Sequence, residues 1–301
     1  MSSVGFRCHF CAVCEGKTCT GQMPGMGGPN QNRNFIKNCQ DWKSLALKSD
    51  GIVREVQLRL APMTGGVENI GYSDERQFYQ DLVAACVSAG VALSIGDGCP
   101  DEKLQFGIEA VKDARHLNPH IKSAVFIKPY ADTKIRERID WAASIMEIGG
   151  IDIDSYNIVT MRNLVHLERK TPEQLSSIKR LLNARGIPFA IKGIFTEDDV
   201  ETVRMVKPDI AYISNHGGRV ETRTGSTACF LEAYHTTLLK SAGSLWVDGG
   251  IRTANDMQTA AFFGASTVLL GRPFASALCR GGAKAVHDLV ALFKVASGEI
   301  K

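Results

Sequence analysis

The stretch LWVDGGIRTANDMQTAAFFGASTVLLGRPF, residues 245–274, contains one complete copy of the pattern that runs through this chain. An apolar run, Leu245–Asp248, ends in glycines, and Thr253 behind them is a typical N-cap for an amphipathic helix. A second apolar run, Thr267–Gly271, follows that helix and again ends in glycine. Short, nearly all-apolar runs of this kind predict strands of a parallel sheet that is buried on both faces.

The same strand–helix unit recurs upstream. We expect further strands at Val53–Ala61, Val91–Ile95, Ala124–Lys128, Ile151–Asp154, Phe189–Lys192 and Ile210–Ser214. Helical spacing of apolar residues predicts helices at Ser73–Ala89, Lys134–Ile148 and Pro172–Arg185, with N-caps at Ser73, Thr171, Thr196, Thr227 and Thr253. Eight strands that alternate with helices predict an α/β fold, a (β/α)8 TIM barrel over residues 51–301.

Residues 1–50 are expected to form an irregular N-terminal extension and a lead-in helix. Residues 1–34 are rich in cysteine and glycine and have no periodic apolar pattern, and a helix is expected from about Phe35 to Lys48. Four cysteines in this arm have a spacing that approaches an iron–sulfur pattern, and four thiolates also suit structural zinc. These four are Cys8, Cys11, Cys14 and Cys19. Free or redox-active thiols remain the other interpretation.

Composition restricts the class of protein. Of the 301 residues, 44% are hydrophobic and 22% charged, as in a soluble globular protein. A net charge of +3, with Lys and Arg spread along the chain, gives no reason to expect a nucleic-acid partner. No run is long and apolar enough for a membrane span, and the first residues lack the apolar core of a signal peptide. We therefore expect a cytoplasmic protein whose nine cysteines are reduced thiols or metal ligands.

Two glycine–arginine segments predict an anion site at the end of the barrel. The seventh strand runs into Asp248-Gly-Gly-Ile-Arg252, and the eighth runs into Gly271-Arg272. Glycines let backbone N–H groups approach an anion, and each arginine offers forked donors. The loops after strands seven and eight are the usual phosphate site of this fold. Ordinary turn glycines with solvated arginines are the alternative.

The sixth strand ends in Ile213-Ser-Asn-His-Gly-Gly-Arg219, which predicts a catalytic base. A neutral imidazole at His216 could take a proton from a hydroxyl, while Arg219 grips a carboxylate through two parallel hydrogen bonds. Asp152 and Asp154 on strand four point to one side by alternation, and a carboxylate near His216 would fix its tautomer. A buried ion pair or a helix cap is the competing interpretation for either aspartate.

These motifs resemble the FMN-dependent 2-hydroxy-acid oxidising family, which includes glycolate oxidase and lactate oxidase. The resemblance is dense from Pro172 to Ala277 and absent over residues 1–50. It implies that His216 is the base, Asp154 its partner and Arg219 the carboxylate clamp. It implies an FMN site formed by Met63, Thr64, Ser94, Asp152, Lys192, Ser214, Asp248, Gly250, Arg252, Gly271 and Arg272.

The chain departs from the family pattern in the substrate region. Phe126 and Lys128 align where the family has a glutamine and a tyrosine, and Tyr130 lies just beyond. Asp152 stands where a threonine is expected, and the N-terminal tyrosine of the family has no counterpart. The loop from about Ser155 to Lys170 is short for the family. We expect Lys128 or Tyr130 to assist Arg219 with the substrate carboxylate.

Three functions are open at this point. The leading hypothesis is FMN-dependent oxidation of a small L-2-hydroxy acid, with His216 as base and hydride passing to flavin N5. The electron acceptor is unknown, and we expect a homo-oligomer. The alternatives are an FMN-dependent isomerase resembling type 2 isopentenyl-diphosphate isomerase, and a non-catalytic flavin or metal redox sensor that uses the cysteine arm.

Overall fold

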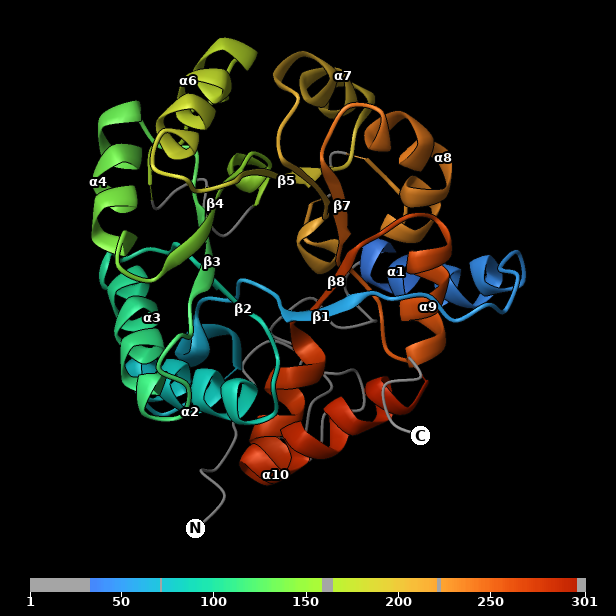
Figure 1. The fold of residues 1–301 in the computed structure, drawn as a ribbon, viewed down its shortest axis with the longest axis horizontal. Helices are drawn as coiled ribbons and strands as arrows, with labels where there is room; N and C mark the ends of the chain where they lie inside the picture. The colour runs from blue at the N-terminus through green and yellow to red at the C-terminus, as the bar shows by residue number, and fades with distance from the viewer. Residues whose placement is uncertain (1–32, 71, 159–164, 221–222, 297–301) are drawn as a thin grey trace.

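Eight parallel strands form a ring in the computed structural model (Figure 1). The structure describes residues 33–70, 72–158, 165–220 and 223–296. Neighbouring strands pair in chain order, and the last strand pairs with the first. A bridge between Arg59 and Ala92 closes the ring. The strands are β1 Gln57–Leu60, β2 Leu93–Gly96, β3 Ser123–Ile127, β4 Met146–Asp152, β5 Phe189–Ile194, β6 Ile210–Ile213, β7 Ser244–Val247 and β8 Thr267–Leu270.

Helices surround this ring as an outer layer (Figure 1). They are α1 Arg33–Ala46, α2 Glu75–Ser88, α3 Glu102–Asp113, α4 Asp132–Ala142, α6 Pro172–Asn183, α7 Glu197–Val206, α8 Thr227–Leu239, α9 Ala254–Phe262 and α10 Arg272–Ala296. Short helical turns are η2 Gly66–Ile70, η3 Ala114–His116, η4 Ser155–Asn157 and η5 His216–Gly218. The predicted (β/α)8 barrel is confirmed.

Two apolar layers hold the barrel together. The larger layer lies between the strands and the helices, and it includes Leu60, Phe189 and Val247. The smaller one fills the ring with alternate strand residues, among them Phe126 and Tyr212, whose rings meet edge to face. A filled interior leaves the strand ends as the place where a ligand can bind.

Two strand boundaries predicted from sequence are wrong. β1 begins at Gln57 rather than Val53, because Val53 is 54% exposed and has no strand partner among the described residues. α4 ends at Ala142, and the segment predicted as its last turn starts β4 at Met146. Gly150 of β4 faces the Phe126 ring, where a Cβ atom would come within 2.6 Å of a ring carbon. The apolar residues around Met146 fit both the helical spacing and a buried strand, so the spacing alone did not separate helix from strand.

Most predicted helix starts agree with the structure. Thr171, Thr196 and Thr253 each accept a hydrogen bond from the third helical N–H and complete capping boxes. Two caps are wrong by one residue: Asp74 caps α2 in place of Ser73, and Ser226 caps α8 in place of Thr227. In both cases a neighbouring residue of equal capping ability has the extended backbone that the position needs.

The lead-in helix α1 packs directly on the barrel. Its Trp42 Nε1 donates to the Gly249 carbonyl at 2.7 Å, in the loop after β7. Asn38 exchanges side-chain hydrogen bonds with Asn215, in the loop after β6. The sequence-based division at residue 50 stays a prediction, but α1 is part of the wall behind the strand-end loops.

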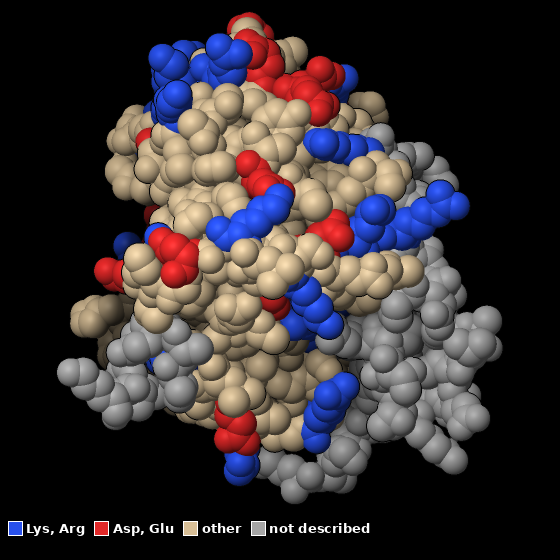
Figure 2. All heavy atoms as spheres, turned by 90° about the vertical axis from the view of Figure 1, so that its right-hand side faces the viewer, with Lys and Arg blue, Asp and Glu red and all other residues tan. Residues whose placement is uncertain are grey.

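Charges of both signs are scattered over the face formed on the side of α7, α8 and α9 (Figure 2). The described part of this face carries no continuous basic strip of the kind that nucleic acids bind (Figure 2). Among the described helices, none is long and apolar enough to cross a bilayer.

Candidate active site

A cavity opens where the strands end, and it brings the predicted site residues together. It encloses about 1060 Å³, counting the solvent space at its open mouth. Twelve of the predicted residues line it: Met63, Thr64, Lys128, Asp152, Lys192, His216, Arg219, Asp248, Gly250, Arg252, Gly271 and Arg272. All of these come from strand ends, or from the segments that follow them, at one end of the barrel.

The turn η5 fixes the position of His216. The Asn215 side chain accepts from the Gly218 N–H at 2.9 Å and caps the turn, and the His216 N–H donates to Ser214 Oγ. His216 has φ +52, and the two glycines behind it also have positive φ, which glycine adopts without strain. Gly218 is the tighter contact, because a Cβ atom there would lie 2.5 Å from the Phe35 nitrogen of α1. The turn is therefore set both by its own glycines and by α1.

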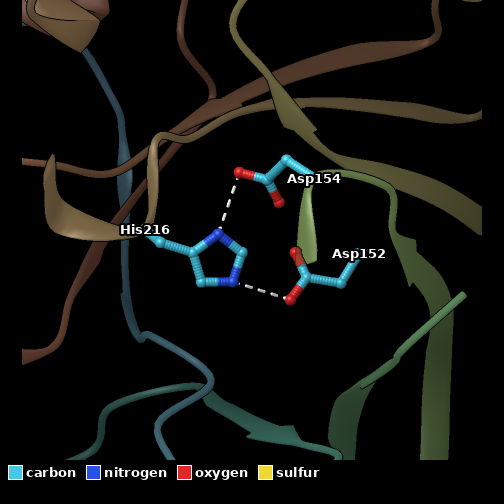
Figure 3. Close-up of side chains that lie close together, drawn as sticks. All are labelled: Asp152, Asp154 and His216. Carbon is cyan, nitrogen blue, oxygen red and sulfur yellow. Dashed lines mark hydrogen bonds and ion pairs between the residues drawn. The ribbon is translucent and has the colours of Figure 1, made fainter. Parts of the chain in front are cut away.

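Two carboxylates hold the two nitrogens of the His216 ring (Figure 3). Asp154 Oδ2 lies 2.9 Å from Nδ1, and Asp152 Oδ2 lies 2.9 Å from Nε2. Asp152 is the last residue of β4, and Asp154 follows two residues later. The predicted partnership of Asp154 with His216 is thus present in the geometry. The contact of Asp152 with the opposite nitrogen was not predicted.

Lys192 completes a buried quartet of charges. Its Nζ lies 2.8 Å from Asp152 Oδ1 and 3.4 Å from His216 Nε2. Burial by itself lowers the pKa of His216, but the charges of Asp152 and Asp154 outweigh it and raise that pKa. Burial acts to raise the pKa of Asp152, yet His216 and Lys192 hold it well below its ordinary value. Burial raises the pKa of Asp154.

Gly193 makes room for Asp154. It has φ +95, and a Cβ atom there would lie 2.3 Å from Asp154 Oδ1. The β5–β6 register shifts at this point, between Lys192 and Ile194. A small residue in the middle of an apolar strand is thus explained by the carboxylate that lies against it.

We expect Gly193→Ala to destabilise the protein by roughly 2–4 kcal/mol, from backbone strain plus displacement of Asp154. Gly186→Ala is the matched control, because Gly186 has φ +71 and nothing within 4 Å of its Cβ position. Urea unfolding of both variants measures the difference. Equal losses of stability in the two would show that Asp154 does not depend on Gly193.

An arginine cluster, Arg219, Arg252 and Arg272, also lines the cavity. Burial pushes the pKa of Arg272 well below its ordinary value, and the charges of Arg219 and Arg252 add to that effect. A guanidinium keeps its proton in proteins, so the shift expresses the cost of holding three cations together. Arg272 Nη1 donates to the Gly217 carbonyl at 2.8 Å, and the Phe35 ring lies 4.5 Å from its guanidinium carbon. Such a cluster favours an anion as its counter-charge.

The glycines after β7 border this cluster. Gly249 and Gly250 both have positive φ, and a Cβ atom on Gly250 would lie 1.9 Å from the Asn38 carbonyl. Asp248 accepts a hydrogen bond from the Tyr212 hydroxyl through Oδ2, while Oδ1 has no hydrogen-bond partner among the described residues. A hydroxyl-bearing ligand between Asp248 and the arginines would satisfy both charges.

Lys128 contributes a further buried cation. It is 5% exposed, lines the cavity, and forms no ion pair or side-chain hydrogen bond with any residue in the described ranges. Burial lowers the pKa of Lys128, while Asp152 and Asp97 oppose that effect. Asp97, also on the cavity wall, is itself paired with the buried Arg138 of α4, and burial raises its pKa to about 6.

Four predicted residues lie outside the cavity lining: Ser94, Asp154, Ser214 and Tyr130. Asp154 reaches the site through its hydrogen bond to His216. Ser94 and Ser214 are buried in the strand ends, and Ser214 instead positions the His216 backbone. Tyr130 is buried, and its hydroxyl has no hydrogen-bond partner among the described residues. Its ring lies under Lys134 and Arg138, at 4.5 and 6.0 Å. The four cysteines of the predicted metal site lie outside the described residues.

Sequence reasoning missed the contribution of α1 to this site. Phe35, Asn38 and Trp42 recur at helical spacing on its buried face and contact the loops after β6, β7 and β8. The spacing could have been noticed, but the partner of that face is set only by packing. Asp97 was missed because a lone acid after a strand resembles a helix cap.

Asp152, Asp154 and His216 are close enough to be considered as metal ligands. The carboxylates contact opposite nitrogens of one ring, and a single ion can bind through only one of them. Lys192 is already the counter-charge of Asp152. The arrangement therefore suits proton chemistry better than metal binding.

Comparisons with known proteins agree with this geometry. The profile of the family described as FMN-dependent dehydrogenase matches residues 110–296, more than half of the chain. The 2-hydroxyacid oxidase of Dictyostelium discoideum is 34% identical over 117 residues, which are 39% of this chain and 30% of that protein. An L-lactate dehydrogenase of Vibrio parahaemolyticus is 37% identical over 106 residues, 35% of this chain and 28% of that protein. The matched region is thus a little under a third of each relative.

Solved structures share the fold at low sequence identity. A mandelate oxidase variant superposes with a TM-score of 0.65 at 18% identity, covering 89% of this chain and 85% of the other. A flavocytochrome b2 variant superposes with a TM-score of 0.63 at 17% identity, covering 88% and 74%. Barrel, strand-end site and family profile lead to one conclusion: the chain belongs to the family of FMN-dependent dehydrogenases.

Proposed function

We propose that this protein oxidises a small L-2-hydroxy acid to the 2-oxo acid with FMN as its cofactor. The observation that carries the proposal is that His216, held by Asp154, lines the same cavity as an arginine cluster. An imidazole backed by a carboxylate can accept a hydroxyl proton, and the carboxylate then stabilises the imidazolium.

The residues on the cavity wall fit FMN. Arg252 and Arg272, with the glycine backbone after β7, would hold the phosphate, and Asp248 Oδ1 would accept from a ribityl hydroxyl. Lys192 would lie against the flavin ring, with Met63 and Thr64 on the wall. When bound, FMN supplies the acceptor for the hydride that leaves substrate C2.

The substrate carboxylate is assigned to Lys128 and Arg219. Lys128 is a buried cation on the cavity wall without an ion pair in the described part of the chain. Arg219 lies near Arg272 and would reach the carboxylate from the phosphate side. His216 then takes the hydroxyl proton at Nε2, while Asp154 keeps Nδ1 protonated. The part assigned to Tyr130 stays a prediction.

Anaerobic bleaching of the bound flavin by a panel of 2-hydroxy acids tests the proposal. At least one L-2-hydroxy acid should bleach the yellow protein, and the D-enantiomer should not. Isopentenyl diphosphate in the same panel tests the isomerase alternative, and metal analysis tests the cysteine-arm sensor. A protein that cannot be loaded with FMN, or that no hydroxy acid reduces, would contradict the proposed function.

Lys128→Met should raise KM for the acid roughly 10- to 100-fold, because a charge-assisted hydrogen bond contributes about 1.5–3 kcal/mol. Lys122→Met is the control, because Lys122 precedes the same strand and is exposed. Steady-state kinetics with the best acid of the panel measures both. An unchanged KM in Lys128→Met would remove Lys128 from the substrate site.

A further inference from the structure

Asp152 contacts Nε2 of His216, the ring nitrogen that the substrate hydroxyl has to reach. Nδ1 is held by Asp154, so Nε2 is the nitrogen left for proton transfer. In the structure Asp152 Oδ2 lies 2.9 Å from Nε2 (Figure 3). A threonine in this position, as the family pattern has, could offer a hydroxyl but no charge. An aspartate changes both the access to Nε2 and its charge.

A proton has to lie between Nε2 and Asp152. A neutral imidazole has one N–H donor and one lone pair. If the N–H points to Asp154, the Nε2 lone pair would face a carboxylate oxygen at hydrogen-bond distance, and two acceptors would meet without a proton. With Nδ1–H donating to Asp154, the contact at Nε2 is favourable only when Nε2 also carries a proton, or when Asp152 itself is protonated.

The surrounding charges favour the first of these two states. With His216 protonated, the two aspartates are balanced by His216 and Lys192, and the quartet is neutral. Burial alone would lower the pKa of His216, yet the two carboxylates raise it. The charged groups facing this part of the cavity are Asp97 after β2, Lys128 after β3, Asp154 after β4, Lys192 on β5, Arg219 after η5, Asp248 and Arg252 after β7, and Arg272 on α10.

We propose that Asp152 is a positioning residue that keeps His216 protonated in the resting site and so sets the pH at which His216 can act as a base. The base role rests on the function proposed above. The proton held between Nε2 and Asp152 leaves to solvent, and Nε2 then accepts the proton of the substrate hydroxyl. Lys192 keeps Asp152 charge-balanced when Asp152 no longer bonds to His216.

The protonation of His216 should make the rate of flavin reduction depend on pH. A raised pKa means that the neutral base exists only at higher pH. Flavin reduction by the wild-type protein should therefore rise with pH, through a midpoint above the ordinary pKa of histidine. Asp152→Thr and Asp152→Asn remove the charge at Nε2, and we expect the midpoint to fall by about one pH unit or more.

Two measurements test this proposal on the FMN-loaded protein. The first is the pH profile of single-turnover flavin reduction under anaerobic conditions, for the wild type and both variants. The second is an NMR titration of the ¹⁵N-labelled histidine rings, which needs no turnover. The chain has seven histidines, and His216→Asn assigns the signal. Asp198→Asn is the control, because its side chain is 79% exposed and it removes the same charge far from the ring.

The expected results are a His216 imidazolium at pH 7 in the wild type and in Asp198→Asn, and a neutral ring in Asp152→Thr. A wild-type ring that is neutral at pH 7, or the same titration midpoint in the wild type and both Asp152 variants, overturns the proposal. The proposed function fails by a different result, which is that no acid of the panel bleaches the flavin. The NMR titration tests the role of Asp152 independently of that result. Rescue of the wild-type midpoint by Asp152→Glu would support a charge effect over a purely steric one.

Discussion

His216→Ala should bind FMN and remain yellow, yet lose flavin reduction by the best 2-hydroxy acid roughly 10²- to 10⁴-fold, the usual contribution of a general base. The ring contacts Asp152 and Asp154 and lies on the cavity wall, whereas the phosphate cluster is built from other residues. Anaerobic stopped-flow reduction measures the loss, and the flavin absorbance measures retention.

Removing His216 also leaves two buried carboxylates, of which only Asp152 forms an ion pair with Lys192 among the described residues. This adds a stability cost, because an uncompensated buried charge is strongly unfavourable. His216→Asn is the second variant, since it keeps a polar side chain between the carboxylates. His120→Ala, at an exposed histidine, is the control. Flavin reduction at the wild-type rate in a folded His216 variant would rule out His216 as the base.

Arg272→Met should weaken FMN binding at least roughly 100-fold, because it removes a buried, charge-assisted donor to the phosphate. The FMN-free variant should unfold at the same or a higher urea concentration than the FMN-free wild type. Burial and the charges of Arg219 and Arg252 make Arg272 costly when no anion is bound. Fluorescence titration with FMN and urea unfolding measure the two effects.

In Arg272→Met, a loss of FMN affinity without a loss of stability would identify Arg272 as part of an anion site and not as an ordinary structural arginine. A structural Arg272, bonded to the Gly217 carbonyl and stacked on Phe35, would lose stability as well as affinity when replaced. Arg280→Met is the matched control, because Arg280 lies on the same helix and is exposed. Unchanged FMN affinity in Arg272→Met would move the phosphate elsewhere.

The sequence predicted the barrel because each of its strands is a short apolar run and several of the helices carry a capping signal. It failed where two patterns overlapped. At Met146 the apolar spacing continues from α4 into β4. The glycines of β4 are explained only by the side chains packed against them, which leave no room for a Cβ atom. The cap at Asp74 was missed because Ser73 has the same capping chemistry.

The residues of the candidate site were also visible in the sequence, at the ends of the predicted strands. Their roles were less visible. Asp152 was assigned with the cofactor residues, but the structure places its carboxylate on His216 Nε2 and its other oxygen on Lys192. The ring of Tyr130 lies against Lys134 and Arg138, off the cavity wall, and its part in substrate binding stays a prediction.

Periodicity, capping residues and the glycine–arginine motifs by themselves determined the fold and located the candidate site, with His216 in it, at one end of the barrel. These signals are local, because each of them lies within one short segment of the chain. Only the tertiary structure decided which carboxylate meets which ring nitrogen, that the three arginines line one cavity, and that α1 forms part of the wall. Those properties depend on distances between segments that are far apart in the chain, and no local pattern records them.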